Sequence, residues 1–160
     1  MRSKIRVVTI GKYTTTVLLV FYVVTLIVTI SGSNRAFEEV SAPLIRALEN
    51  TDLAPVNGQG FRHAYGINPA DLEGVVMFTS TFSMSAEEVL LIQVSNSAQI
   101  NDVVQVIEES LVTRRQSFAG VAPGEVHWID NAQLTVRGDY IFLAISPRAT
   151  ELRRVFLDSL

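Results

Sequence analysis

Residues 89–111 read VLLIQVSNSAQINDVVQVIEESL and join two kinds of predicted secondary structure in one run. The first six residues, VLLIQV, are almost entirely apolar and rich in branched side chains, which favours a strand. After the polar turn SNS, apolar residues recur at helical spacing at positions 100, 103, 104, 107 and 111. This stripe, with acids early and arginines late, predicts an amphipathic helix over residues 97–118.

Residues 140–160, YIFLAISPRATELRRVFLDSL, repeat the order of strand, serine and helix. A further strand is predicted before each run, over residues 75–79 and residues 127–137, and Gly138-Asp139 is typical of a hairpin turn. The domain can therefore be read as strand-strand-helix written twice, a possible duplication. Because runs of hairpins bury one side of a sheet, we expect an α+β fold with a four-stranded, mainly antiparallel sheet and helices packed on one face.

The segment before these runs has a weaker pattern. Residues 37–48 carry apolar side chains at helical spacing and predict a helix, with Pro43 as a kink or a first-turn residue. Residues 50–60 are rich in glycine and polar residues and predict a loop. A single helical turn over residues 61–65 should end at Gly66.

Residues 13–30, YTTTVLLVFYVVTLIVTI, form an uninterrupted uncharged stretch near the N-terminus. A helix that crosses the hydrocarbon layer needs about 20 apolar residues, so this run predicts a transmembrane anchor. Four basic residues precede the run, whereas Arg35 is the single charged residue close behind it. Since basic residues stay on the cytoplasmic side, the N-terminus should be cytoplasmic and the rest of the chain extracytoplasmic.

The predicted organisation has four parts: a cytoplasmic basic tail (residues 1–12), the anchor (13–30), a linker (31–36) and an extracytoplasmic α+β domain (37–160), held at the cell membrane by a single-pass helix. The alternative is a signal peptide cleaved near Ser31 to Ser33, which would leave a secreted domain. The apolar run is longer than the roughly 7–15 residues of a typical signal peptide, which favours the anchor. Both interpretations place the α+β domain outside the cell.

Charge divides unevenly along the chain. Residues 36–160 contain all 16 acidic residues and 8 arginines, a net charge of −8, while both lysines lie in the first 12 residues. Nucleic acid is therefore not an expected partner of the domain, because binding phosphates needs a basic face. The chain has no cysteine, which excludes a disulfide, a thiolate metal site and a lipidated cysteine.

Several short motifs occur in an order that resembles one known family. They are YGIN (residues 65–68), EVLLI (88–92), QSF (116–118) and GDYIFLAIS (138–146). In order and spacing they resemble DUF4358, a bacterial domain of unknown function, from about residue 48 to the C-terminus. The resemblance implies an exported lipoprotein or membrane-anchored protein of Gram-positive bacteria, and it implies no activity. The missing cysteine departs from the lipoprotein pattern.

Motifs for catalysis and metal binding are weak. His63 and His127 are the two histidines, and neither belongs to an H-x-x-x-H or H-E-x-x-H pattern. No G-x-S-x-G nucleophile motif is present. Adjacent glutamates, such as Glu87 and Glu88, are interpreted as solvated faces. We therefore expect no catalytic residues, no metal site and no cofactor.

One cluster is a candidate for binding, because polar and aromatic residues crowd a short irregular segment there. Its members are Arg62, His63, Tyr65, Asn68 and Asp71. Trp128, at the predicted start of a strand, is a candidate exposed aromatic. Structural roles compete with binding: Asn68 as a helix cap, Tyr65 and Trp128 as core residues, and Arg62 in an ion pair.

The sequence favours a non-enzymatic, membrane-anchored extracytoplasmic module that binds a peptide, a protein or a cell-wall component. A second hypothesis is an accessory or structural subunit of a membrane complex, in which the apolar helix contacts another membrane protein. A hydrolase acting on envelope material is the third. No residue pattern identifies the ligand, the partner or the oligomeric state.

Overall fold

The computed structural model describes residue 19 and residues 36–160. The predicted basic tail (1–12), the predicted anchor (13–30) apart from Leu19, and nearly all of the predicted linker (31–36) lie outside the described residues. Among the residues that are described, no helix has both the length and the apolar composition needed to cross a membrane. Contacts within Arg35–Leu160 form one compact unit.

The unit is built on a five-stranded antiparallel sheet with the order β1-β2-β3-β5-β4. The strands are β1 (Leu53–Pro55), β2 (Leu72–Ser80), β3 (Glu88–Val94), β4 (Gln133–Arg137) and β5 (Tyr140–Ile145). Gly138 has a φ of 56° in the turn between β4 and β5, where the hairpin was predicted. The α+β class is confirmed, but the prediction of four strands is wrong.

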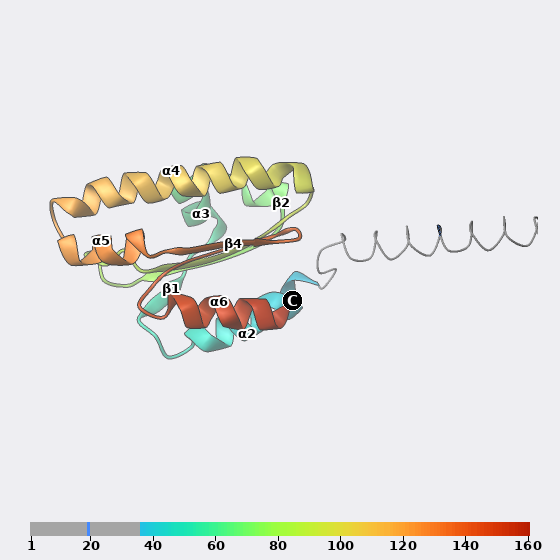
Figure 1. Cartoon of the computed structure of the whole chain (residues 1–160), viewed down its shortest axis with the longest axis horizontal. Helices are drawn as coiled ribbons and strands as arrows, with labels where there is room; N and C mark the ends of the chain where they lie inside the picture. The colour runs from blue at the N-terminus through green and yellow to red at the C-terminus, as the bar shows by residue number, and fades with distance from the viewer. Residues whose placement is uncertain (1–18, 20–35) are drawn as a thin grey trace, which may run out of the picture. The chain divides into compact units, whose positions relative to one another are not determined.

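Helices cover both faces of the sheet, as the two layers in Figure 1 show. One face carries α3 (Gly58–Tyr65), α4 (Ile100–Ala119) and α5 (Pro123–Asp130). The opposite face carries α2 (Phe37–Leu48) and α6 (Ala149–Ser159). Each face has its own buried cluster of apolar side chains. The prediction that helices pack on one face is therefore wrong.

The composition of the two central strands, β3 and β5, explains why α2 and α6 cover a second face of the sheet. Leu90 and Ile92 of β3 point into the cluster under α4, whereas Val89 and Leu91 point into the cluster under α6. Strand β5 is buried along its whole length, with no polar residue among Tyr140–Ile145 apart from the tyrosine hydroxyl. A strand that is apolar on both sides needs cover on both faces, because exposing either face would leave a row of large apolar side chains in water.

The additional strand, β1, lies in the segment predicted to be a loop. Leu53 pairs with Ser80 and Pro55 pairs with Phe78, so β1 forms one edge of the sheet. Three residues are too few to show a period, and proline has no N–H to give to a ladder. Proline is tolerated here because β1 is an edge strand.

The segment 127–131 also differs from its prediction. It was expected to open a strand, but His127 and Trp128 lie in α5, and β4 begins at Gln133. Pro123 occupies the first turn of α5 and Glu125 follows it, which is favourable at a helix start. These start signals outweigh the weak strand preference of the residues after them.

The two predicted strand-strand-helix units are present in the chain order, but their helices do not lie on the same face of the sheet. β2, β3 and α4 form the first unit, and β4, β5 and α6 form the second. Their helices pack on opposite faces of the sheet. A twofold repeat of neighbouring antiparallel strands would place both helices on one face, so the fold does not support the possible duplication.

Candidate functional site

The candidate site begins at the connection between α3 and β2. Asn57 caps the start of α3, where its Oδ1 accepts a hydrogen bond of 2.9 Å from the Gly60 amide. Gly66 ends the helix in the left-handed conformation, with a φ of 72°. Glycine adopts this conformation without a steric cost, and it turns the chain sharply out of the helix axis. The turn carries Ile67 and Asn68 toward the start of α4.

The next turn, η1 (Pro69–Asp71), is tied to the β3–α4 connection. The carbonyl oxygen of Asp71 accepts hydrogen bonds from Gln99 Nε2 at 3.1 Å and from Ser95 Oγ at 3.4 Å. Gln99 Oε1 in turn accepts a hydrogen bond of 3.1 Å from the Asn96 amide, as part of a capping box. Gln99 therefore uses both ends of its amide group to fix η1 against the beginning of α4.

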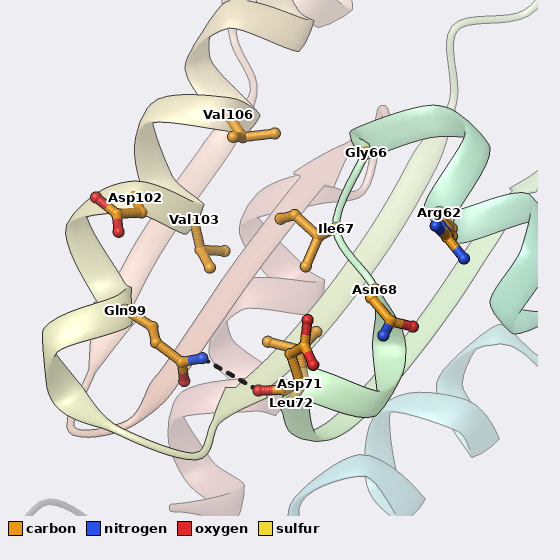
Figure 2. Close-up of a pocket in the computed structure, with 10 residues that line it drawn as sticks. All are labelled: Arg62, Gly66, Ile67, Asn68, Asp71, Leu72, Gln99, Asp102, Val103 and Val106. Atoms are coloured by element: carbon orange, nitrogen blue, oxygen red, sulfur yellow. Dashed lines mark hydrogen bonds between the residues drawn. The ribbon is translucent and has the colours of Figure 1, made fainter.

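A pocket of about 300 Å³ lies between these two segments. Figure 2 shows Val103 and Val106 of α4 facing Ile67 across it, with Asp71 below. We call this the first pocket; its lining residues are Arg62, Gly66, Ile67, Asn68, Asp71, Leu72, Gln99, Asp102, Val103 and Val106. Its volume is at the lower end of the range of small-molecule sites, about 300–1,000 Å³.

A second pocket of about 490 Å³ adjoins the first and is more open to solvent. It is lined by Asn57, Gly58, Gln59, Arg62, Asn68, Pro69 and Ala70. Arg62 and Asn68 line both pockets, so these two side chains stand between them. Together the pockets extend along both sides of the α3–β2 connection.

The charged side chains of the first pocket have no partner among the described residues. Arg62, Asp71 and Asp102 are exposed and form no ion pair there, whereas several other arginines of the domain do. No group of three or more potential metal ligands occurs among the described residues. The first pocket therefore presents two carboxylates and one guanidinium that are free to meet a ligand.

Behind the pocket lies a buried polar network. Glu88 of β3 is 0% exposed, and its carboxylate accepts hydrogen bonds from the Tyr65 hydroxyl and from Arg114 Nη2. The Arg114 guanidinium also lies 6.0 Å from the centre of the Tyr65 ring. The network joins α3, β3 and α4, and so holds the end of α3 where the pocket loop begins.

Burial raises the pKa of the Tyr65 hydroxyl well above its ordinary value, and the Glu88 carboxylate raises it further. For Arg114, burial alone would lower the pKa, but the Glu88 and Tyr65 oxygens outweigh it and the pKa is raised. Tyr65 therefore stays a neutral donor and Arg114 a cation over the whole physiological range.

The structure brings together three of the six predicted site residues: Arg62, Asn68 and Asp71 line the first pocket. His63 is exposed and lines neither pocket. Tyr65 is 5% exposed, its hydroxyl bonds to Glu88, and it lines neither pocket. Trp128 is half-buried on α5, edge-on to His127, and lines neither pocket.

Sequence reasoning missed Gln99, Asp102 and Glu88. Gln99 and Asp102 reach the pocket because the start of α4 packs beside η1, a contact that no local pattern encodes. Glu88 was interpreted as part of a solvated face, yet it is fully buried. Its two partners, Tyr65 and Arg114, lie 23 and 26 residues away in sequence. The sole signal for its burial was its position directly before the apolar run VLLI.

Residues 46–146 match the family described as Domain of unknown function (DUF4358). The chain belongs to this family. The DUF4358 match runs from the end of α2 through β5, and all residues of both pockets and of the buried network fall within it. No curated protein and no solved structure gives a significant match to the chain.

Proposed function

We propose that this DUF4358 protein is a membrane-anchored extracytoplasmic module that binds an extended peptide and does not transform it chemically. The observation that carries the proposal is the first pocket, of about 300 Å³, in which Ile67 of the α3–β2 connection faces Val103 and Val106 of α4. The adjoining second pocket gives the ligand a second place of contact.

The geometry favours binding because the pocket is built before any ligand arrives. Hydrogen bonds from Gln99 and Ser95 to the Asp71 carbonyl fix η1 beside the start of α4. The left-handed turn at Gly66 sets the direction of the chain that carries Ile67. A preformed site avoids the entropic cost of ordering loops on binding, a cost of about 0.5–1.5 kcal/mol for each side chain immobilised.

The chemistry of the lining supports recognition over turnover. The residues of the first pocket provide carboxylates, carboxamides, a guanidinium and aliphatic side chains, but no hydroxyl, thiol or imidazole side chain. Nucleophilic catalysis through a serine, threonine, cysteine or histidine side chain is therefore not supported by this lining. Two adjoining pockets that share Arg62 and Asn68 suit alternate side chains, i and i+2, of an extended peptide, because these point to the same side and lie about 6.6 Å apart along the chain.

The location rests on the sequence. Residues 13–30 are uncharged and follow four basic residues, and all acidic residues come later. This order supports a single anchoring helix with the binding domain outside the cytoplasm. A tethered module would then meet peptides of the cell surface or envelope.

Binding is tested with the full chain in a mild detergent. A displayed library of random peptides is selected against it, and the affinity of the selected peptides is measured by fluorescence anisotropy. Ala70→Trp places a bulky ring in the second pocket, whereas Ala42→Trp adds the same ring to an exposed position of α2 on the opposite face. We expect Ala70→Trp to weaken binding about tenfold, or about 1.4 kcal/mol, and Ala42→Trp to have no effect. Equal affinities for the two variants, or a library without binders, would refute the proposal.

Topology is tested separately, and the lack of native cysteine makes the test clean. Ser3→Cys and Ser83→Cys introduce one thiol each, before the apolar run and in the exposed β2–β3 connection. A membrane-impermeant thiol reagent added to intact cells should label the thiol at position 83 and not the one at position 3. Labelling at position 3 alone would reverse the proposed orientation.

A further inference from the structure

Charge and shape in the first pocket point to one class of ligand group. Asp71 is one of the three charged residues that line the first pocket, and Figure 2 shows its side chain below Ile67. Asp71 forms no ion pair or side-chain hydrogen bond with any described residue. An anionic group is therefore available at the base of the pocket.

The walls around this carboxylate are aliphatic. Val103 and Val106 project from α4 on one side and Ile67 projects from the α3–β2 connection on the other (Figure 2). A ligand that fills the pocket therefore needs an apolar stem to contact these walls. It also needs a group at its end that can approach a carboxylate favourably.

The second carboxylate of the pocket, that of Asp102, fits the same ligand. Asp102 lies on the rim in the first turn of α4, where its negative charge offsets the positive end of the helix dipole. An anionic ligand would meet two carboxylates here. Calcium would need about six to eight oxygen ligands, which a group of two carboxylates does not supply. A cation on a flexible hydrocarbon stem can pack its stem against the aliphatic walls and place its charge beside the carboxylates.

We propose that the first pocket binds the side chain of lysine, or another primary ammonium on an aliphatic stem, with Asp71 as its counter-ion. This specificity rests on the proposed function, because the lysine belongs to the bound peptide. The four methylenes of lysine pack between Val103, Val106 and Ile67 while the ammonium reaches the Asp71 carboxylate. Arg62 also lines the first pocket, but Figure 2 shows it across the Gly66–Asn68 segment from Asp71 and Asp102.

The inference is tested with three short capped peptides, Gly-Lys-Gly, Gly-norleucine-Gly and Gly-Glu-Gly. Norleucine keeps a linear aliphatic chain and lacks the ammonium. The full chain in detergent, labelled at isoleucine and valine methyl groups, is titrated with each peptide and followed by NMR at Ile67, Val103 and Val106. We expect the lysine peptide to shift these methyl signals and to bind about fivefold more tightly than the norleucine peptide, as a partly exposed ion pair allows.

Two variants locate the charge. Asp71→Asn keeps the shape of the side chain and should remove the preference for lysine over norleucine. Asp158→Asn is the matched control, because Asp158 is an exposed aspartate on α6, on the opposite face of the sheet. Added salt should weaken the lysine peptide more than the norleucine peptide, because it screens the ion pair alone.

The outcomes separate this inference from the proposed function. Equal binding of the lysine and norleucine peptides, or a preference for lysine that survives Asp71→Asn, overturns the ammonium assignment but leaves peptide binding in place. Tighter binding of the glutamate peptide also overturns the assignment. If the random library contains no binder, the proposed function fails as well.

Discussion

Arg114 Nη2 lies 2.6 Å from Glu88 Oε2, and this contact joins α4 to the centre of the sheet. The Glu88 side chain is 0% exposed and the Arg114 side chain is 24% exposed, so the carboxylate depends on Arg114 for its counter-charge and on Tyr65 for a further hydrogen bond. Removing one partner of a buried pair leaves the other charge without compensation, which costs far more than the pair contributes when intact.

Replacing Arg114 by methionine should therefore destabilise the domain strongly. Arg114→Met keeps most of the aliphatic stem but leaves the buried Glu88 carboxyl without its cationic partner, and we expect the free energy of unfolding to fall by about 3 kcal/mol. The matched control is Arg115→Met, since Arg115 pairs with Asp130 at 2.7 Å but both side chains are about half exposed. That change should cost less than about 1 kcal/mol. Urea unfolding of the full chain in detergent measures both changes; equal losses would contradict the role of the buried Arg114–Glu88 pair.

The same network predicts a loss of stability in alkali. Burial, and then the Glu88 carboxylate, raise the pKa of Tyr65 well above its ordinary value of 10.0. Below pH 10 the phenol is protonated in both the folded and the unfolded chain, so the network contributes its full stability there. Above pH 10 the unfolded chain releases the proton and the folded chain does not, so the unfolding free energy falls by up to about 1.4 kcal/mol per pH unit.

Tyr65→Phe should reduce this alkaline slope, although it also removes a hydrogen bond and lowers stability at neutral pH by about 1–3 kcal/mol. Tyr140 contributes to the slope too, because burial and then Asp139 raise its pKa. Unfolding free energies between about pH 8 and 11 are compared for the wild type, Tyr65→Phe and Tyr140→Phe. An unchanged slope in Tyr65→Phe would show that the folded chain releases the Tyr65 proton as readily as the unfolded chain does.

Much of the fold could be predicted from local pattern. The apolar runs in β3 and β5, the stripe of α4 and the turn at Gly138 are signals carried within a few residues each, and the structure confirms these elements. The sequence also contains the signal that helices cover both faces of the sheet. A strand that alternates apolar and polar residues needs one cover, but β3 and β5 do not alternate and need two.

The candidate site was predictable only in part, because a site joins segments that are distant in sequence. Arg62, Asn68 and Asp71 are close in sequence and were found as a cluster of polar residues. Gln99 and Asp102 come from the start of α4, and their place in the pocket depends on how α4 packs against η1. The partners of Glu88 depend on tertiary packing in the same way, which is why its burial was missed.

A side chain at Gly74 of β2 should clash with the Phe37 ring of α2. A Cβ at Gly74 would lie 2.3 Å from Cγ of Phe37, well inside contact distance. We expect Gly74→Ala to lower the unfolding free energy by about 1–3 kcal/mol, because the ring must leave its packed position. Gly120→Ala is the control, since a Cβ there meets no atom within 4 Å and the φ is −92°. In a double-mutant cycle, Phe37→Ala should make Gly74→Ala nearly neutral; additive losses would place the clash elsewhere.

Substitution of Gly66 should weaken the turn beside the pocket through backbone strain alone. A Cβ at Gly66 meets nothing within 4 Å, so substitution there introduces no clash, but its φ of 72° is unfavourable for a residue with a side chain. Gly66→Ala should cost about 1–2 kcal/mol, whereas Gly66→Asn should cost less, because asparagine tolerates the left-handed conformation better. The loss should be local: amide hydrogen exchange at Ile67 and Asn68 should speed up more than exchange in β3, since the turn that directs these residues into the pocket is weakened. If alanine and asparagine are equally destabilising, then the turn does not depend on the left-handed backbone of Gly66.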